Sequence, residues 1–180
     1  MPIAVRISFV LCVLLVPAAR AQSPVVADTS ALEFLGFRAG AHLSEVGARI
    51  RELDGGRLRC DRAKADRRVT ECRATLTDPA TALPVDLWLS AIDSLAGVMT
   101  LSGEVEGDEL DRWRGGIERR YGRVGAQVQG TQWMMQWVRR GRMMRLTWRM
   151  ERGERVASVS LVDGRVLDGW GRARSRAGSR

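Results

Sequence analysis

The chain has 180 residues and a formal net charge of +8, and Lys64 is its only lysine, so the positive charge is almost entirely arginine. Acidic residues are interspersed among the arginines, and no run of five like charges occurs before the C-terminal tail. A nucleic-acid-binding protein would need a concentrated basic stripe with stacking aromatic residues. The composition therefore argues against a nucleic-acid partner.

The first 21 residues have the pattern of a cleavable signal peptide. A positive start over residues 1–6 precedes an apolar run over residues 7–16, and Ala19-Arg20-Ala21 gives a small-x-small cleavage site. The apolar run is shorter than the roughly 20 residues that span a bilayer, and no lipobox surrounds Cys12. We predict a periplasmic or secreted protein cut after Ala21. An uncleaved N-terminal anchor helix is the alternative.

Cleavage would leave 27 basic and 21 acidic residues in a chain of 159 residues, which is long enough for one compact domain or two small ones. Residues 22–35 begin with small, polar and proline-containing positions, which predicts a flexible lead-in.

Two amphipathic helices are predicted at the sequences LSEVGARIRELDGG and DELDRWRGGIERRYG. His42 or Ser44 can cap the first helix, and Gly55-Gly56 ends it. The apolar positions of the second helix repeat those of the first at an offset of 67 residues: Leu43, Val46 and Ile50 correspond to Leu110, Trp113 and Ile117.

Each predicted helix is followed by three strand-like segments. We therefore predict an α+β fold of two helix-plus-three-strand units, residues 36–103 and 104–168, in which an antiparallel sheet carries the helices on one face. Residues 124–129 are a possible additional edge strand. A single α+β domain without duplication has much the same layers and remains the alternative.

Residues 131–150 contain three of the six Trp and five of the seven Met. Arg140-Gly141 lies between two apolar stretches, which predicts a hairpin whose paired residue numbers add up to 281. Successive side chains point to opposite faces of a strand. This register places six side chains of the hairpin on the helix-covered face, where we predict that they belong to the core: Trp133, Met135, Trp137, Met144, Leu146 and Trp148.

The opposite face of the sheet has no predicted cover. In LPVDLWLSAI, Trp88 alternates with the apolar residues and so points away from the core. Trp, Met and Arg are enriched at protein interfaces. We therefore predict that six outward-facing residues bind a partner: Trp88, Met134, Gln136, Met143, Arg145 and Arg149.

Cys60 and Cys72 are the two cysteines beyond the signal peptide, and in an oxidising compartment an even pair predicts a disulfide. A thiol or metal pair is the weaker alternative, because His42 is the only histidine. Thioether copper binding needs converging ligands, usually with histidine, so the methionines do not favour it. No metal or other cofactor is predicted.

No catalytic motif is recognisable, and we predict a protein that is not an enzyme. The acidic residues of EVEGDELD suit the N-terminus of the second helix through its dipole. Residues 169–180 are predicted to be a disordered basic tail, which offers at most a contact with anionic lipid. A hydrolase would need a polar cleft that joins His42 to a nucleophile and an acid.

The duplicated layout, with the helix start GAHLSEV at residues 40–46, resembles exported tandem α/β modules such as the beta-lactamase inhibitor protein fold and the small outer-membrane assembly lipoproteins of the SmpA/OmlA type. The likeness is topological and implies a non-enzymatic role. We predict an exported protein that docks a protein partner of the cell envelope on its open sheet face. The alternative is a carrier or sensor of a small apolar or anionic ligand held between sheet and helices.

Overall fold

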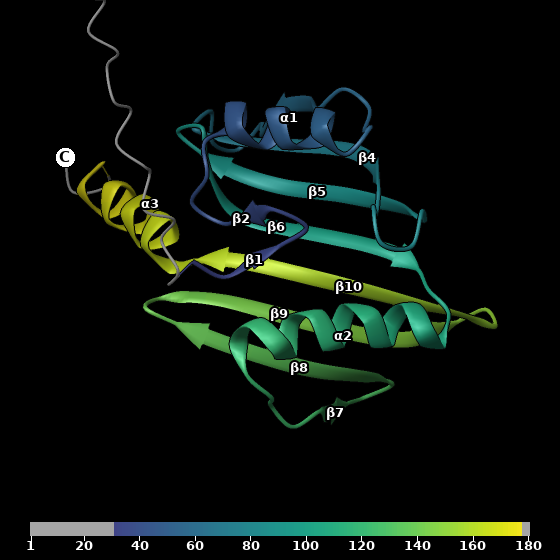
Figure 1. Ribbon diagram of the computed structural model, residues 1–180. Coiled ribbons are helices and arrows are strands. Elements are labelled where there is room, and N and C mark those ends of the chain that lie inside the picture. The colour runs from purple at the N-terminus through teal and green to yellow at the C-terminus, as the bar shows by residue number, and fades with distance from the viewer. Residues whose placement is uncertain (1–30, 178–180) are drawn as a thin grey trace, which may run out of the picture.

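A computed structural model describes residues 31–177, so the predicted signal peptide of residues 1–21 lies outside the described residues. The fold is the predicted α+β class (Figure 1). An antiparallel eight-stranded sheet carries α1 (Leu43–Glu52) and α2 (Gly107–Tyr121) on one face, and α3 (Gly164–Ala177) projects from one end. None of the described helices is long and apolar enough to cross a membrane.

The sheet runs in the order β3-β4-β5-β6-β10-β9-β8-β7, and every neighbouring pair is antiparallel. A separate two-stranded ribbon is formed by β1 (Glu33–Phe34) and β2 (Phe37–Arg38). The strands of the large sheet are β3 (Arg59–Arg62), β4 (Val69–Thr77), β5 (Pro84–Ile92), β6 (Leu95–Glu104), β7 (Gln127–Gln129), β8 (Gln132–Arg139), β9 (Arg142–Glu151) and β10 (Glu154–Asp163).

Each unit contributes four strands rather than the three predicted, because β3 and β7 pair as short edge strands of their own. The last strand of each unit meets the other at the centre of the sheet, where β6 pairs with β10. The strand order therefore mirrors itself about this central seam, with one helix and four strands on each side.

The two covering helices form where capping and apolar spacing agree. His42 Nδ1 accepts a hydrogen bond from the backbone N–H of Ser44, and Val46 and Ile50 are the buried residues of α1. A reciprocal capping box between Glu106 and Glu109 starts α2. The acidic residues at this position thus serve the helix N-terminus, as predicted. The buried face of α2 comprises Leu110, Trp113, Ile117 and Tyr121.

The predicted hairpin register is confirmed, because Trp137 pairs with Met144 and Met135 with Leu146, and these four side chains are buried. Trp148 is partly buried against the same core. The prediction that Trp133 belongs to the core is wrong, since its side chain is 47% exposed. The alternation of side chains along β8 places Trp133 on the helix-covered face. However, α2 does not cover this corner of the sheet.

Both predicted boundary segments contain ordered residues. Within the predicted lead-in of residues 22–35, Leu32 and Phe34 are buried, and Tyr121 Oη accepts a hydrogen bond of 2.8 Å from the Glu33 N–H. Residues 31–35 thus belong to the packed fold. Within the predicted disordered tail of residues 169–180, α3 continues to Ala177. Contacts with the rest of the fold, such as the 2.8 Å bond from Trp170 Nε1 to Asp66 Oδ2, hold this helix in place.

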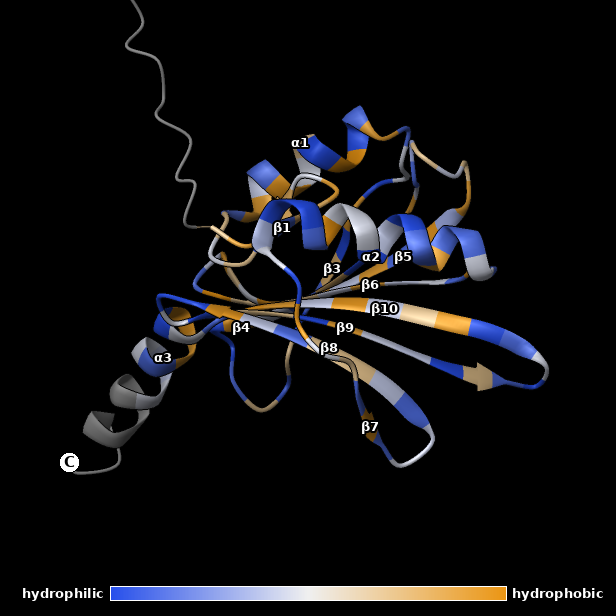
Figure 2. Ribbon diagram, turned by 60° about the horizontal axis from the view of Figure 1, so that its bottom comes forward, coloured by the Kyte–Doolittle hydropathy of each residue, from blue (hydrophilic) through white to orange (hydrophobic). Residues whose placement is uncertain are grey.

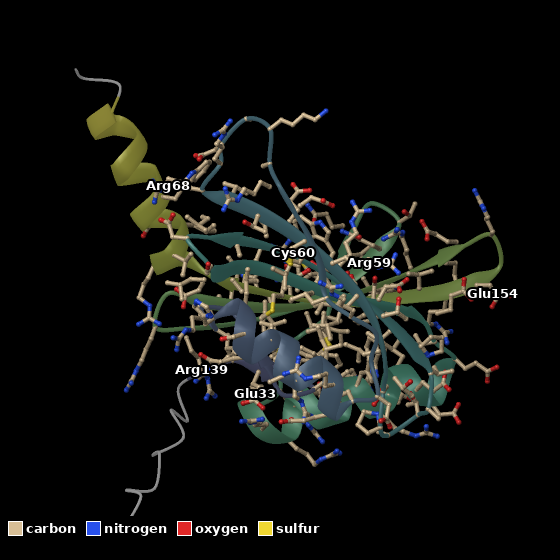
Figure 3. All side chains as sticks on the ribbon, turned by 90° about the horizontal axis from the view of Figure 1, so that it is seen from above. Glu33, Arg59, Cys60, Arg68, Arg139 and Glu154 are labelled. Carbon is tan, nitrogen blue, oxygen red and sulfur yellow. A yellow bond between two sulfur atoms is a disulfide. The ribbon has the colours of Figure 1, made fainter. Side chains whose placement is uncertain are left out.

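The predicted disulfide is present between directly opposed residues of β3 and β4, Cys60 and Cys72. Figure 3 labels Cys60 and the neighbouring Arg59, with the sulfur atoms drawn in yellow. The bond closes a loop with a sequence separation of 12 and so restricts the unfolded chain.

Reducing this disulfide is expected to lower the free energy of unfolding by about 3 kcal/mol, through the greater freedom of the unfolded chain. Urea unfolding with and without a reductant measures the loss. A variant with Cys60→Ala and Cys72→Ala serves as control, because a reductant should not change its stability. Equal unfolding midpoints for oxidised and reduced wild-type protein would contradict the expectation.

Candidate functional site

The face of the sheet opposite α1 and α2 is here called the open face. Figure 2 shows both helices on one side of the strands, with α3 reaching away from one end on the other side. Val166 and Leu167 of α3 pack against Gly97 of β6 near that end of the sheet. The helix leaves the middle of the open face uncovered.

One row of side chains crosses the open face from edge to edge. Strand pairing connects its members in the order Arg59, Arg73, Trp88, Thr100, Ser160, Arg145 and Gln136. Three inter-strand steps separate Trp88 from Arg145, which is about 14 Å at the usual strand spacing. The six residues predicted to bind a partner therefore do not form a single cluster.

Five of the six predicted residues lie together on β8 and β9, and we call them the Met–Arg patch: Met134, Gln136, Met143, Arg145 and Arg149. Arg145 Nη2 donates to Gln136 Oε1 at 3.0 Å and lies 3.9 Å from Met143 Sδ. Arg149 forms a 2.8 Å ion pair with Glu151. Both guanidinium groups of this patch thus have a partner, which is the neutral amide of Gln136 for Arg145 and the adjacent carboxylate of Glu151 for Arg149.

Trp88 lies in the other half of the open face, in a cleft of about 640 Å³. Arg57, Arg59 and Arg73 also line this cleft, and we call these four residues the arginine cleft. Arg59 lies directly opposite Arg73, which in turn lies opposite Trp88.

The guanidinium groups of the arginine cleft are available to a ligand. None of the three arginines forms an ion pair with another described residue. The nearby carboxylate of Asp86 accepts a 2.8 Å hydrogen bond from Thr75 Oγ1 instead. Trp88 is half-buried, so part of its apolar side chain lies open to the cleft beside three exposed cations. Guanidinium groups bind carboxylates through paired hydrogen bonds, and this arrangement suits an acidic group next to an apolar one.

A hydroxyl strip on β6 and β10, which includes Thr100, Ser158 and Ser160, separates the arginine cleft from the Met–Arg patch. Thr100 and Ser160 are hydrogen-bonded through their hydroxyl groups at 3.1 Å, and Thr147 and Ser158 at 2.8 Å. The hydroxyl groups of these small side chains thus satisfy one another. Within residues 31–177, no group of three or more His, Cys, Asp or Glu side chains is arranged to hold a metal ion.

A second hollow, of about 420 Å³, lies on the helix side between α2 and the β1–β2 ribbon. Its lining includes Phe34, Trp113 and Tyr121, and the rings of Phe34 and Trp113 meet edge to face at 5.0 Å. Burial raises the pKa of the Tyr121 phenol, which keeps it uncharged. The hollow is lined by α2, by the β1–β2 ribbon and by the loop after β4, so it lies beside α2 and not at the predicted position between the large sheet and the helices.

Sequence reasoning missed the three arginines of the cleft. Their alignment depends on the register of β3 against β4, which a charged turn of irregular length separates. Compared with known protein families, curated proteins and solved structures, the chain matches none of them.

Proposed function

We propose that this chain is an exported binding protein that docks a protein partner on its open face, with the arginine cleft as the anchor. The observation that carries the proposal is the row in which Arg59, Arg73 and Trp88 lie side by side. The two arginines have no ion-pair partner among the described residues. The disulfide is compatible with an oxidising compartment outside the cytoplasm, and a periplasmic or secreted location is part of the proposal.

Trp and Arg are the residue types that dominate binding energy when they lie in a surface depression that a partner can seal from water. The arginine cleft provides such a depression. In it, a carboxylate of the partner would gain charge-assisted hydrogen bonds from Arg73 and Arg59, while an adjacent apolar side chain would contact Trp88. The Met–Arg patch would form the second half of the same contact, across the hydroxyl strip. The resemblance to exported tandem modules stays a prediction and implies the same class of role.

Site-specific photo-crosslinking in intact cells tests this function. A crosslinking residue placed at Gln136 is expected to give a discrete protein adduct, because Gln136 is exposed on the open face. Arg73→Glu in the same chain should reduce that adduct at least about tenfold, since it replaces attraction by repulsion at the anchor. Arg119, which is exposed on α2 at the other face, is the matched position for a control crosslinker.

The absence of any adduct at Gln136, or equal adducts at Gln136 and Arg119, would contradict the proposal. So would an adduct at Gln136 that Arg73→Glu leaves unchanged. Circular dichroism and thermal unfolding of Arg73→Glu confirm that the variant is folded, which its exposed position leads us to expect.

The aromatic-lined hollow beside α2 supports a second candidate, the carrier or sensor of a small ligand. Phe34 and Trp113 offer apolar walls, and Arg120 stands at the rim, where it pairs with Glu33 at 3.2 Å. Native mass spectrometry of the purified protein tests this candidate, because a resident ligand would add a fixed mass that denaturation removes. A single apo mass under both conditions would exclude a retained ligand.

A further inference from the structure

The corner of the sheet that α2 leaves uncovered carries a group of four apolar side chains, three of them exposed and one partly buried. We call Val128, Trp133, Trp148 and Met150 the edge patch. Val128 and Met150 are each 60% exposed, and the rings of Trp133 and Trp148 stack at 6.2 Å with an interplanar angle of 6°. Val128 lies opposite Trp133, and Trp133 opposite Trp148, so the patch is continuous. It reaches the free rim of the sheet at β7.

The two rims of the sheet differ in chemistry. At one rim, β3 has the sequence RCDR, and its cysteine is bonded to β4. Charged residues of this kind protect a sheet edge from pairing with another chain. The other rim is formed by β7 (Figure 1). Its sequence QVQ carries no charge. The rim without charged residues is thus the one beside the edge patch.

The absence of charge extends well beyond β7. Residues 124–138 contain no Asp, Glu, Lys or Arg, although 28% of the chain is charged. Two copies of a chain with a net charge of +8 repel each other over most of their surfaces. The β7 rim is a part of the surface where that repulsion is weakest.

We propose that β7 is a self-association edge, and that its occupant is β7 of a second copy of this chain. A twofold axis through Val128 would pair the strands antiparallel, with Gln127 opposite Gln129 of the second copy and Val128 opposite its own equivalent. Glutamine amides both donate and accept hydrogen bonds, so identical strands complement each other. The edge patches of both copies would meet on the helix side of one continuous sheet.

This contact involves a three-residue strand and a small apolar patch, so it is smaller than a standard stable interface. We expect a reversible dimer with a dissociation constant in the micromolar range. The open face and its arginine cleft stay accessible in such a dimer, so the inference is independent of the proposed function.

Sedimentation velocity from low micromolar to submillimolar concentrations tests the inference. The wild-type protein should shift from monomer to dimer, and Val128→Lys should weaken the association at least about tenfold, because it places like charges opposite each other. Val138→Lys is the matched control. Val138 is 62% exposed and lies on β8, but its side chain is on the open face and not in the edge patch. This variant should therefore dimerise like the wild type.

A mixture of Val128→Lys and Val128→Glu identifies the geometry. Each variant alone should be monomeric, while the mixture should form a heterodimer at least as tight as the wild-type dimer, because only the twofold pairing puts residue 128 opposite itself. A wild-type protein that stays monomeric at all concentrations would overturn the inference. So would equal weakening by Val138→Lys, or a mixture that fails to associate, which would assign β7 to a different occupant or to none.

Discussion

Replacing Trp113 with alanine is expected to lower the free energy of unfolding by about 3–5 kcal/mol. Trp113 is buried in α2, its ring packs against Phe34, and its Nε1–H donates a 2.7 Å hydrogen bond to Asp78 Oδ2. Asp78 is itself fully buried and also accepts hydrogen bonds from the Ala80 N–H and the Thr81 hydroxyl. The variant would therefore lose a large apolar side chain and remove a donor from a buried carboxylate. Urea unfolding followed by circular dichroism measures the loss.

Trp113→Phe separates these two contributions. It keeps most of the ring but removes the donor to Asp78, and we expect a loss of about 1–3 kcal/mol. Combining it with Asp78→Ala should give less than the sum of the single losses, because both variants break the same bond. Trp88→Phe on the open face is the matched control and should cost less, since Trp88 is only half-buried. Additive losses for Trp113 and Asp78 would show that the hydrogen bond contributes nothing.

The second large effect is expected at Asp163, where β10 passes into α3. Its buried carboxylate accepts a 2.9 Å bond from Arg142 Nε, and bonds from the Arg165 backbone N–H at 3.0 Å and from Arg165 Nη2 at 3.2 Å. Asp163→Ala should cost about 3 kcal/mol. This value is at the low end for a buried pair, because Arg142 is 15% exposed and Arg165 62% exposed. Urea unfolding at neutral pH measures it.

The same carboxylate makes the stability depend on pH. Burial raises the pKa of Asp163, but the hydrogen bonds from Arg165 and Arg142 outweigh burial and hold the pKa below its ordinary value. A lowered pKa in the folded state stabilises the fold above the unfolded pKa of about 3.9, and this contribution disappears as the pH falls through the folded pKa. The stability difference between wild type and Asp163→Asn should therefore shrink below about pH 4. A difference in the free energy of unfolding that stays constant as the pH falls below about 4 would contradict this linkage.

Local patterns were sufficient to predict much of the fold. The apolar spacing of Leu43, Val46 and Ile50 predicts a helix because those positions share one face of the 3.6-residue period. The alternation around Arg140-Gly141 predicts the register of β8 against β9, because a shift by one residue would expose the core side chains. The six predicted partner-binding residues were placed on the uncovered face by the same alternation.

The features that were missed depend on contacts between distant segments. Alternation assigns Trp133 to a face, but the length and position of α2 decide whether anything covers it. The arginines and small residues that follow Trp170 favour a disordered tail, and α3 instead depends on tertiary contacts with Asp66 and Gly97. A usable signal existed for the arginine cleft. The predicted bond between Cys60 and Cys72, read as a directly opposed pair, also places Arg59 opposite Arg73.

The central seam has a consequence for the order in which the chain folds. Six of the seven neighbouring strand pairs join strands that are consecutive in the sequence, whereas β6 and β10 bring together residues such as Thr100 and Ser160, which are 60 positions apart. Local hairpins close quickly, while the entropy cost of a long loop delays distant pairing. The seam is therefore expected to form last. Until β10 has been synthesised, the growing chain presents β6 as an open edge that another molecule could occupy. The second half of the chain thus completes the sheet and also limits exchange of strands between copies that fold at the same time.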